Sequence, residues 1–165
     1  MWYILDAEND GELIVGMKDE ISKENFFKHL EDKTFLDSLN YQMVSKGDAF
    51  YIPSGTIHAI LKGVLLAEIQ QTSDITYRIY DWDRPDTNGQ MRELHTDLAF
   101  DAINFTSKQN HKIEYETNIN QRNLLVACPY FTTNIIEFEK NIFLDIGMSN
   151  KFTLLFYSLA DKLLE

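Results

Sequence analysis

The sequence has little of several features that mark specialised classes of protein. It contains a single cysteine, Cys128, so it cannot form an internal disulfide, and a reducing cytoplasm is the expected location. No apolar run approaches the roughly 20 residues of a membrane-spanning helix. The first residues, Met1 to Asp6, show neither the basic segment nor the cleavage pattern of a signal peptide. We therefore predict a cytoplasmic protein that does not act in a membrane.

Basic residues are also scarce. The chain has 15 lysines and arginines against 26 aspartates and glutamates, a formal net charge of −11. Such a field repels phosphate backbones and anionic lipid surfaces, so neither nucleic acid nor a membrane is an expected partner. It would also repel a phosphorylated small molecule unless basic groups gather locally around the binding site.

What is present is enough for a folded domain. The chain has 165 residues, of which 44% are hydrophobic and 13% aromatic. A chain of this length and composition can bury a core and is not intrinsically disordered.

The most informative stretch runs from Gly47 to His58. Gly47 begins a turn, and residues 49–52 form a short apolar run typical of a buried strand. Pro53 fixes φ and Gly55 tolerates a positive φ, so the chain is expected to reverse at 53–55. His58 then begins another strand, with its imidazole able to face into a sheet.

The rest of the chain predicts mostly short strands. Ser22 can cap a helical excursion over 22–39. Lys33 and Thr34 are expected to divide it into two short helices. This excursion either covers the sheet or binds a partner. Asp97 can cap a further short helix that runs through Ile103. The expected strands are 2–6, 12–17, 41–44, 49–52, 64–71 and 76–81, and residues 82–89 form a loop.

A second set of strands follows a polar stretch. The predicted division is a barrel over 1–105 with its first strands missing, a linker over 106–121 and a partial second β unit over 122–165. Many short strands with few helices favour an all-β antiparallel barrel or jelly roll. The strands expected in the second unit are 122–127, 131–138, 141–146 and 152–158.

The spacing Gly47-x5-Pro53-x-Gly55-x2-His58 resembles the second motif of the cupin superfamily, although Lys62 stands where that motif usually ends in asparagine. A wider set of residues resembles class I mannose-6-phosphate isomerase (phosphomannose isomerase) in its short bacterial form, over about residues 1–135. This set is Tyr51-Ile-Pro-Ser-Gly-Thr-Ile-His58-Ala, Glu68, Ser73-Asp74-Ile-Thr-Tyr-Arg78-Ile-Tyr-Asp81-Trp-Asp83-Arg84 and Leu94-His95.

The resemblance implies a cupin barrel, one zinc ion and the interconversion of mannose 6-phosphate and fructose 6-phosphate. His58 would be a zinc ligand, and Glu68 and Arg78 would be catalytic. Arg78 and Asp74 would bind the substrate. The residue types suit these roles, because a neutral imidazole binds zinc, a carboxylate can carry a proton and arginine can stabilise an anion.

The family's other zinc ligands, a Gln-x-His pair and a glutamate, precede its Trp-Tyr-Ile strand, whereas this chain begins at Met1-Trp2-Tyr3. One histidine does not hold catalytic zinc, and His29, His95 and His111 lack ligand spacing to His58. We therefore expect this chain to be inactive alone. Activity would need an N-terminal partner chain. Alternatives are a non-catalytic sugar-phosphate-binding cupin and a truncated remnant that forms a homodimer through open sheet edges.

Simpler explanations compete for each residue. Glu68 could be an edge-strand glutamate that points to water, and Arg78 could form a surface salt bridge. His95 fits a structural role, and Cys128 fits a small buried hydrophobic residue. The residues from Tyr80 to Arg84 either frame a site or form a charged surface turn.

Overall fold

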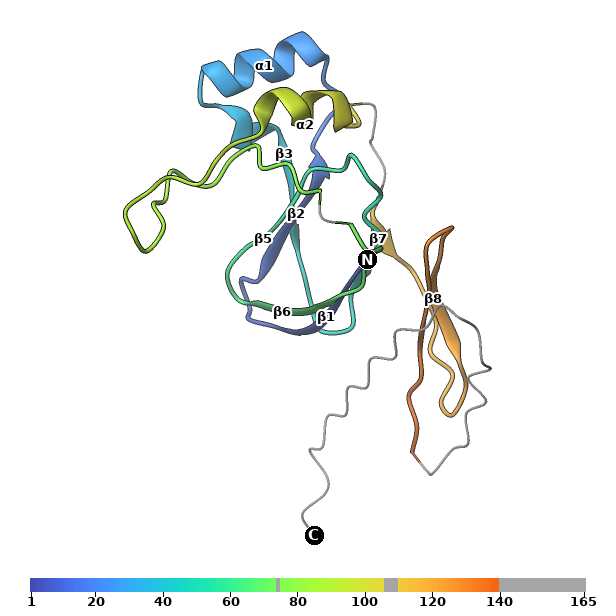
Figure 1. Cartoon of the computed structure of the whole chain (residues 1–165). Helices are drawn as coiled ribbons and strands as arrows, with labels where there is room; N and C mark the ends of the chain where they lie inside the picture. The colour runs from blue at the N-terminus through green and yellow to red at the C-terminus, as the bar shows by residue number, and fades with distance from the viewer. Residues whose placement is uncertain (74, 106–109, 140–165) are drawn as a thin grey trace.

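The computed structural model describes residues 1–73, 75–105 and 110–139, which fold mainly into strands with two α-helices (Figure 1). This confirms the prediction of a β-rich fold. The elements are β1 (Trp2–Ala7), β2 (Glu12–Met17), α1 (Lys23–Glu31), the 3-10 helix η1 (Phe35–Ser38), β3 (Leu39–Met43), β4 (Ala49–Phe50), β5 (His58–Ile60), β6 (Val64–Glu68), α2 (Thr96–Ala102), β7 (Lys112–Ile113), β8 (Asn123–Ala127) and β9 (Thr132–Ile135).

Two antiparallel sheets enclose the first core. One has the strand order β6-β1-β4-β7 and the other β3-β2-β5, and every neighbouring pair of strands is antiparallel. The chain passes from one sheet to the other between β1 and β2 and again at each step from β3 to β6, whereas β2 and β3 stay in one sheet and are joined through the helices α1 and η1. Side chains from both sheets meet between them, as expected for two sheets packed face to face. This core consists of Trp2, Ile4, Leu13, Val15, Val44 and Phe50.

The second core lies on the opposite face of β2. Because side chains alternate across a strand, Leu13 and Val15 face the first core, whereas Ile14 faces the helices. An irregularity in the register between Ile14 and Met17 brings Met17 to the helical face as well. Strand β2 is consequently buried on both faces. Phe26 of α1 forms edge-to-face contacts with Phe35 and Phe105 at ring distances of 5.4 and 5.3 Å.

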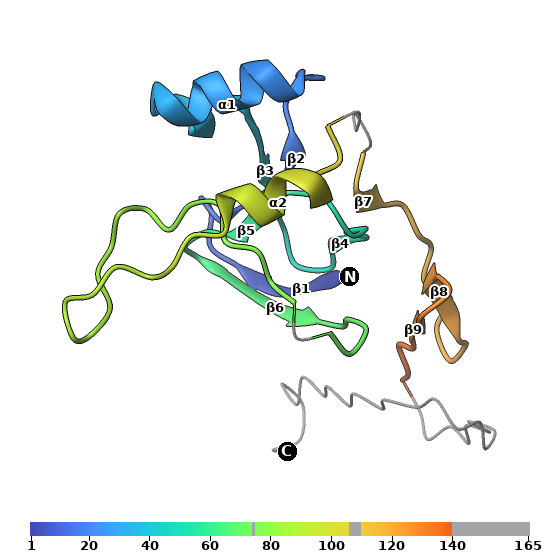
Figure 2. The same cartoon turned by 45° about the horizontal axis from the view of Figure 1, so that its top comes forward.

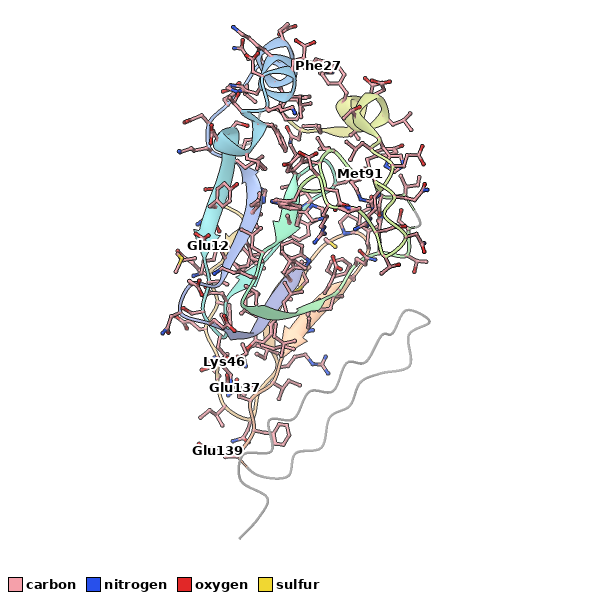
Figure 3. All side chains as sticks on the ribbon, turned by 90° about the vertical axis from the view of Figure 1, so that its left-hand side faces the viewer. Glu12, Phe27, Lys46, Met91, Glu137 and Glu139 are labelled. Atoms are coloured by element: carbon pink, nitrogen blue, oxygen red, sulfur yellow. The ribbon has the colours of Figure 1, made fainter. Side chains whose placement is uncertain are left out.

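The predicted helical excursion over 22–39 is confirmed as two short helices, α1 and η1. Ser22 Oγ accepts a hydrogen bond from the backbone N–H of Asn25, which caps α1 as predicted. Helices α1 and α2 lie at one end of the sheets in Figure 1, and Figure 2 shows that end turned toward the viewer. Phe27, labelled in Figure 3, stacks on Phe100 of α2 at 4.2 Å. Phe26 and Phe35 of the excursion pack against Ile14 of β2, so the excursion covers one face of that strand.

Three local predictions were wrong. Residues 76–81 do not form a strand, because the Arg78 carbonyl accepts from the backbone N–H of His95, and the Arg78 N–H contacts the His95 side chain, instead of pairing with a sheet. Strand β6 ends at Glu68 rather than at residue 71. Helix α2 begins after His95, and Asp97 lies in its first turn rather than at its cap. In each case tertiary contacts decide a boundary that local composition leaves open.

The later part of the chain adds one strand to the first unit and then a hairpin. Strand β7 falls within the predicted linker over 106–121, yet it pairs with β4 at the sheet edge. Strands β8 and β9 form a separate hairpin. The predicted strands 141–146 and 152–158 lie outside the described residues, so the division into 1–105, 106–121 and 122–165 stays a prediction. Within the described ranges no helix is long and apolar enough to cross a membrane.

Candidate functional site

The turn at residues 53–55 places the start of β5. The backbone N–H of Thr56 donates to the carbonyl of Pro53 at 3.2 Å, and Gly55 has a φ of +85°, as the sequence predicts for a tight reversal. The N–H of Asn104 donates to the carbonyl of Gly55 at 2.9 Å. The turn is therefore fixed against the segment that follows α2.

His58 is the first residue of β5 and lies opposite Val15 of β2. Its side chain therefore lies on the face of that sheet that bounds the first core, although the imidazole itself is exposed. His58 Nδ1 lies 2.7 Å from the carbonyl oxygen of Thr56. When Nδ1–H donates to this carbonyl, the lone pair of Nε2 is left available to a metal ion or a proton.

Glu68 ends β6 and lies directly opposite Trp2 of β1. Directly opposed residues of an antiparallel pair share one face of the sheet, so Glu68 lies on the same face as the core residue Trp2. The indole Nε1–H of Trp2 donates to Glu68 Oε1 at 3.0 Å. The Glu68 side chain is exposed, but this hydrogen bond ties it to the inner face instead of leaving it directed freely into water.

Trp2 also contacts His58. The two rings meet edge to face, with centroids 5.3 Å apart and planes at 72°. A buried indole thus links a carboxylate on one sheet with an imidazole on the other. The arrangement brings an imidazole, which can bind a metal ion, and a carboxylate, which can accept a proton, into contact with one buried ring.

Arg78 contacts a different pair of residues. Its backbone N–H lies 3.2 Å from His95 Nδ1, its carbonyl accepts from the N–H of His95 at 2.7 Å, and its Nη1 donates to the carbonyl of Glu93 at 3.1 Å. His95 therefore has the predicted structural role. The Arg78 guanidinium donates to a backbone carbonyl, and among the described residues it forms no ion pair with a carboxylate. Asp74, predicted to bind substrate, lies outside the described residues.

The described residues supply one candidate zinc ligand. Among residues 1–73, 75–105 and 110–139, no group of three or more histidine, cysteine, aspartate or glutamate side chains could hold a metal ion. The chemistry of His58 suits a zinc ligand. The Thr56 carbonyl holds Nδ1 and so orients the ring, and Nε2 on the far side of the ring can donate its lone pair to a metal ion. Catalytic zinc needs about three protein ligands.

The other histidines are placed elsewhere. His29 contacts Thr34 on the helical side of the fold, 2.7 Å from its hydroxyl. His111 is buried beside Gly16, and its Nδ1 lies 3.2 Å from the carbonyl oxygen of Tyr51. Burial lowers the pKa of the His111 imidazole, although the hydrogen bond to Tyr51 opposes the shift.

Sequence reasoning missed two residues. Trp2 was interpreted only as part of a strand, although its alternation with Ile4 places it on the core face. Asp81 is buried and holds Arg84 and Arg92 through Oδ1, at 3.2 and 3.5 Å. The density of charge from Asp81 to Arg84 was the available signal, and it now indicates a loop organised around a buried carboxylate.

Comparison with known proteins places this geometry in context. Mannose-6-phosphate isomerase ManA of Bacillus subtilis is 40% identical over 133 residues, which are 79% of this chain and 42% of the relative. Mannose-6-phosphate isomerase of Streptococcus mutans is 36% identical over 137 residues, with the same coverage. The probable mannose-6-phosphate isomerase GmuF of B. subtilis is 46% identical over 102 residues, 62% of this chain and 32% of the relative. No family model matches the chain.

The solved structures agree. A crystal structure of mannose 6-phosphate isomerase from B. subtilis matches with a TM-score of 0.72 and 36% identity, covering 79% of this chain and 42% of that one. The chain thus spans less than half the length of the curated relatives it matches. Over 79% of its own length, this chain is similar in sequence and in structure to the mannose-6-phosphate isomerases, as its motifs predicted.

Proposed function

We propose that this chain forms the cupin-barrel part of a zinc-dependent mannose-6-phosphate isomerase, which interconverts mannose 6-phosphate and fructose 6-phosphate. The observation that carries the proposal is that His58 and Glu68 both contact the buried indole of Trp2, in a chain 36–46% identical to proteins of that name. These two residues are 10 positions apart in the sequence and lie on different sheets.

Each residue has a role in the proposed reaction. Isomerisation removes a proton from the hydroxyl-bearing carbon beside the carbonyl and returns one to the former carbonyl carbon. The carboxylate of Glu68 would carry this proton. His58 would hold the zinc ion, which when bound supplies a Lewis acid for the sugar oxygens. The guanidinium of Arg78 would stabilise the negative charge of the enediolate.

The substrate carries a phosphate, whereas this chain has a net charge of −11. Local cations must therefore offset the overall field. Arg78, Arg84 and Arg92 gather on one loop region through the contacts of His95 and Asp81. Asp74, which precedes Arg78 in the sequence, is proposed to bind the substrate together with Arg78.

The remaining zinc ligands are proposed to come from an N-terminal segment on a partner chain, since His58 is one ligand of the several required. A second candidate function is sugar-phosphate binding without catalysis, although the relatives, which are all named as isomerases, do not favour it. A homodimer through open sheet edges and a cytoplasmic location stay predictions.

Isomerase activity tests the proposal. Purified chain would be mixed with zinc and the segment of B. subtilis ManA that precedes the matched region; we call this mixture the complemented enzyme. Fructose 6-phosphate formation is followed with a coupled assay. We expect turnover in the complemented enzyme, and a kcat lowered by about 100- to 10,000-fold when Glu68→Gln replaces the parent chain.

The controls separate the two candidate functions. The chain alone and the ManA segment alone are assayed under the same conditions. Calorimetric titration of the chain with mannose 6-phosphate measures binding independently of turnover. Binding without turnover in the complemented enzyme would support the non-catalytic function, and the absence of both would rule out both candidates.

A further inference from the structure

We propose that Trp2 is a positioning residue that holds the Glu68 carboxylate and the His58 imidazole in fixed directions for the isomerisation. The inference rests on the proposed function and goes beyond it, because it assigns a mechanistic role to a side chain that would touch neither the metal ion nor the reacting carbons.

The indole of Trp2 is a rigid support. Its side chain is 3% exposed and belongs to the first core, together with Ile4 and Phe50. Strand β1 lies between β6 and β4, and Trp2 pairs with Glu68 on one side and with Phe50 on the other. Neighbouring strands therefore fix the backbone of Trp2, and the core fixes its ring.

The indole N–H has a defined acceptor. A buried indole N–H must find a hydrogen-bond partner, because leaving it unpaired is unfavourable. Here the acceptor is Glu68 Oε1 at 3.0 Å. The bond ties one carboxylate oxygen of an exposed, flexible side chain to a buried and immobile group. It leaves Oε2 as the oxygen that would exchange the proton.

The same ring limits the orientation of His58. Its edge-to-face contact with Trp2 has a centroid distance of 5.3 Å, and its Nδ1 lies 2.7 Å from the carbonyl oxygen of Thr56. These two contacts restrict the orientation of the imidazole, and with it the direction of the Nε2 lone pair. Trp2 thus sets the relative placement of two groups that are proposed to act on one sugar. Proximity and orientation of this kind contribute strongly to rates.

Two substitutions isolate the role of the N–H. Trp2→Phe keeps an aromatic ring in the core but removes the donor, and Tyr41→Phe is the control, because it removes a donor from an exposed ring on β3. We expect Trp2→Phe to lower kcat of the complemented enzyme roughly tenfold with little change in KM. We expect Tyr41→Phe to leave both close to the parent values. Thermal unfolding of each variant checks that the fold is kept.

A double substitution separates positioning from stability. In the Glu68→Gln background the proton carrier is absent, so Trp2→Phe should lower the residual kcat no further. If Trp2 only stabilised the fold, its substitution would lower kcat by the same factor in both backgrounds. Equal factors would overturn the proposal, as would an unchanged kcat in Trp2→Phe alone.

An NMR measurement tests the hydrogen bond without any activity. In ¹⁵N-labelled Trp82→Phe chain a single indole N–H resonance remains, that of Trp2. Glu68→Ala should move this resonance upfield because its acceptor is lost, whereas Glu68→Gln should move it less because the amide oxygen can still accept. An unmoved resonance in Glu68→Ala would refute the contact.

Failure of the proposed isomerase function and failure of the positioning role of Trp2 give different experimental results. If the hydrogen bond is present but the complemented enzyme shows no turnover, the proposed function fails and the positioning role fails with it. If turnover is normal in Trp2→Phe, the proposed function stands and only the role of Trp2 is overturned.

Discussion

A Cβ atom added at Gly55 would lie 2.5 Å from the carbonyl oxygen of Ala102, at the end of α2. No real Cβ approaches a backbone oxygen so closely, so the turn before His58 and the end of α2 can meet only through glycine. The φ of +85° at Gly55 adds a second reason for glycine at this position.

We expect Gly55→Ala to destabilise the fold and to shift the start of β5. Gly89→Ala is the matched control, because Gly89 also has a positive φ, +78°, but has open space around its Cβ position. Both changes introduce backbone strain of about 1 kcal/mol. Only Gly55→Ala adds a steric overlap, which typically costs a further 1–3 kcal/mol.

Urea unfolding of both variants measures the difference. A larger loss of unfolding free energy in Gly55→Ala than in Gly89→Ala is the expected outcome. Equal losses would mean that the 102–104 segment can move away from an alanine at position 55 at no cost in unfolding free energy, so that this contact does not fix the turn.

His58 supplies a second prediction. In the complemented enzyme, His58→Ala should lower zinc affinity by more than about 100-fold, since losing a ligand should exceed the effect of losing an outer-sphere partner. Equilibrium dialysis followed by atomic absorption measures the bound zinc. His29→Ala is the control, because His29 contacts Thr34 on the helical side. Equal zinc content in His58→Ala and the parent would refute a ligand role for His58.

The local part of this site could be predicted from the sequence, and the long-range part could not. Pro53 and Gly55 define a turn through their own backbone preferences, so the reversal before His58 follows from a few adjacent residues. The pairing of Trp2 with Glu68 joins residues 66 positions apart. It depends on the register of β1 against β6, and a shift of one residue would turn Glu68 to the other face.

The wrong strand at 76–81 has a related cause. Alternation between Tyr77 and Ile79 on one side and Arg78 on the other is the pattern of a strand, but an extended loop has the same alternation. What decides between them is a hydrogen-bonding partner, and Arg78 finds His95, 17 positions later, rather than a sheet edge. The residues around Arg78 in the sequence therefore cannot predict whether the segment forms a strand or a loop.

Arg78 supplies a third prediction. Arg78→Lys keeps the positive charge but loses the planar donor fork, so we expect kcat of the complemented enzyme to fall roughly 100-fold. The backbone contacts with His95 do not depend on the side chain, so the melting temperature should change little. Steady-state kinetics of Arg78→Lys beside Arg122→Lys, an exposed arginine outside the site, test this. A kcat equal to that of the parent in Arg78→Lys would show that the guanidinium of Arg78 has no catalytic role.

His111 supplies a prediction about pH. Burial lowers the pKa of its imidazole below the usual value, so in the acidic range the unfolded chain binds this proton more readily than the folded chain. The contribution of His111 to stability is therefore fully present above the unfolded pKa of about 6.5 and is progressively lost as the pH falls below it. Protonation would place a charge on Nε2, which is buried against Gly16 and has no hydrogen-bond partner among the described residues.

Unfolding free energies of the parent and of His111→Gln, measured by urea titration between about pH 5 and 8, test this because glutamine does not titrate there. The parent should lose stability relative to His111→Gln as the pH falls. The carboxylates that titrate in acid are common to both proteins, so they cancel in the difference. His29→Gln, at an exposed contact with Thr34, is the control and should give a flatter difference from the parent. A pH-independent difference between the parent and His111→Gln would show that His111 accepts its proton without opposing the fold.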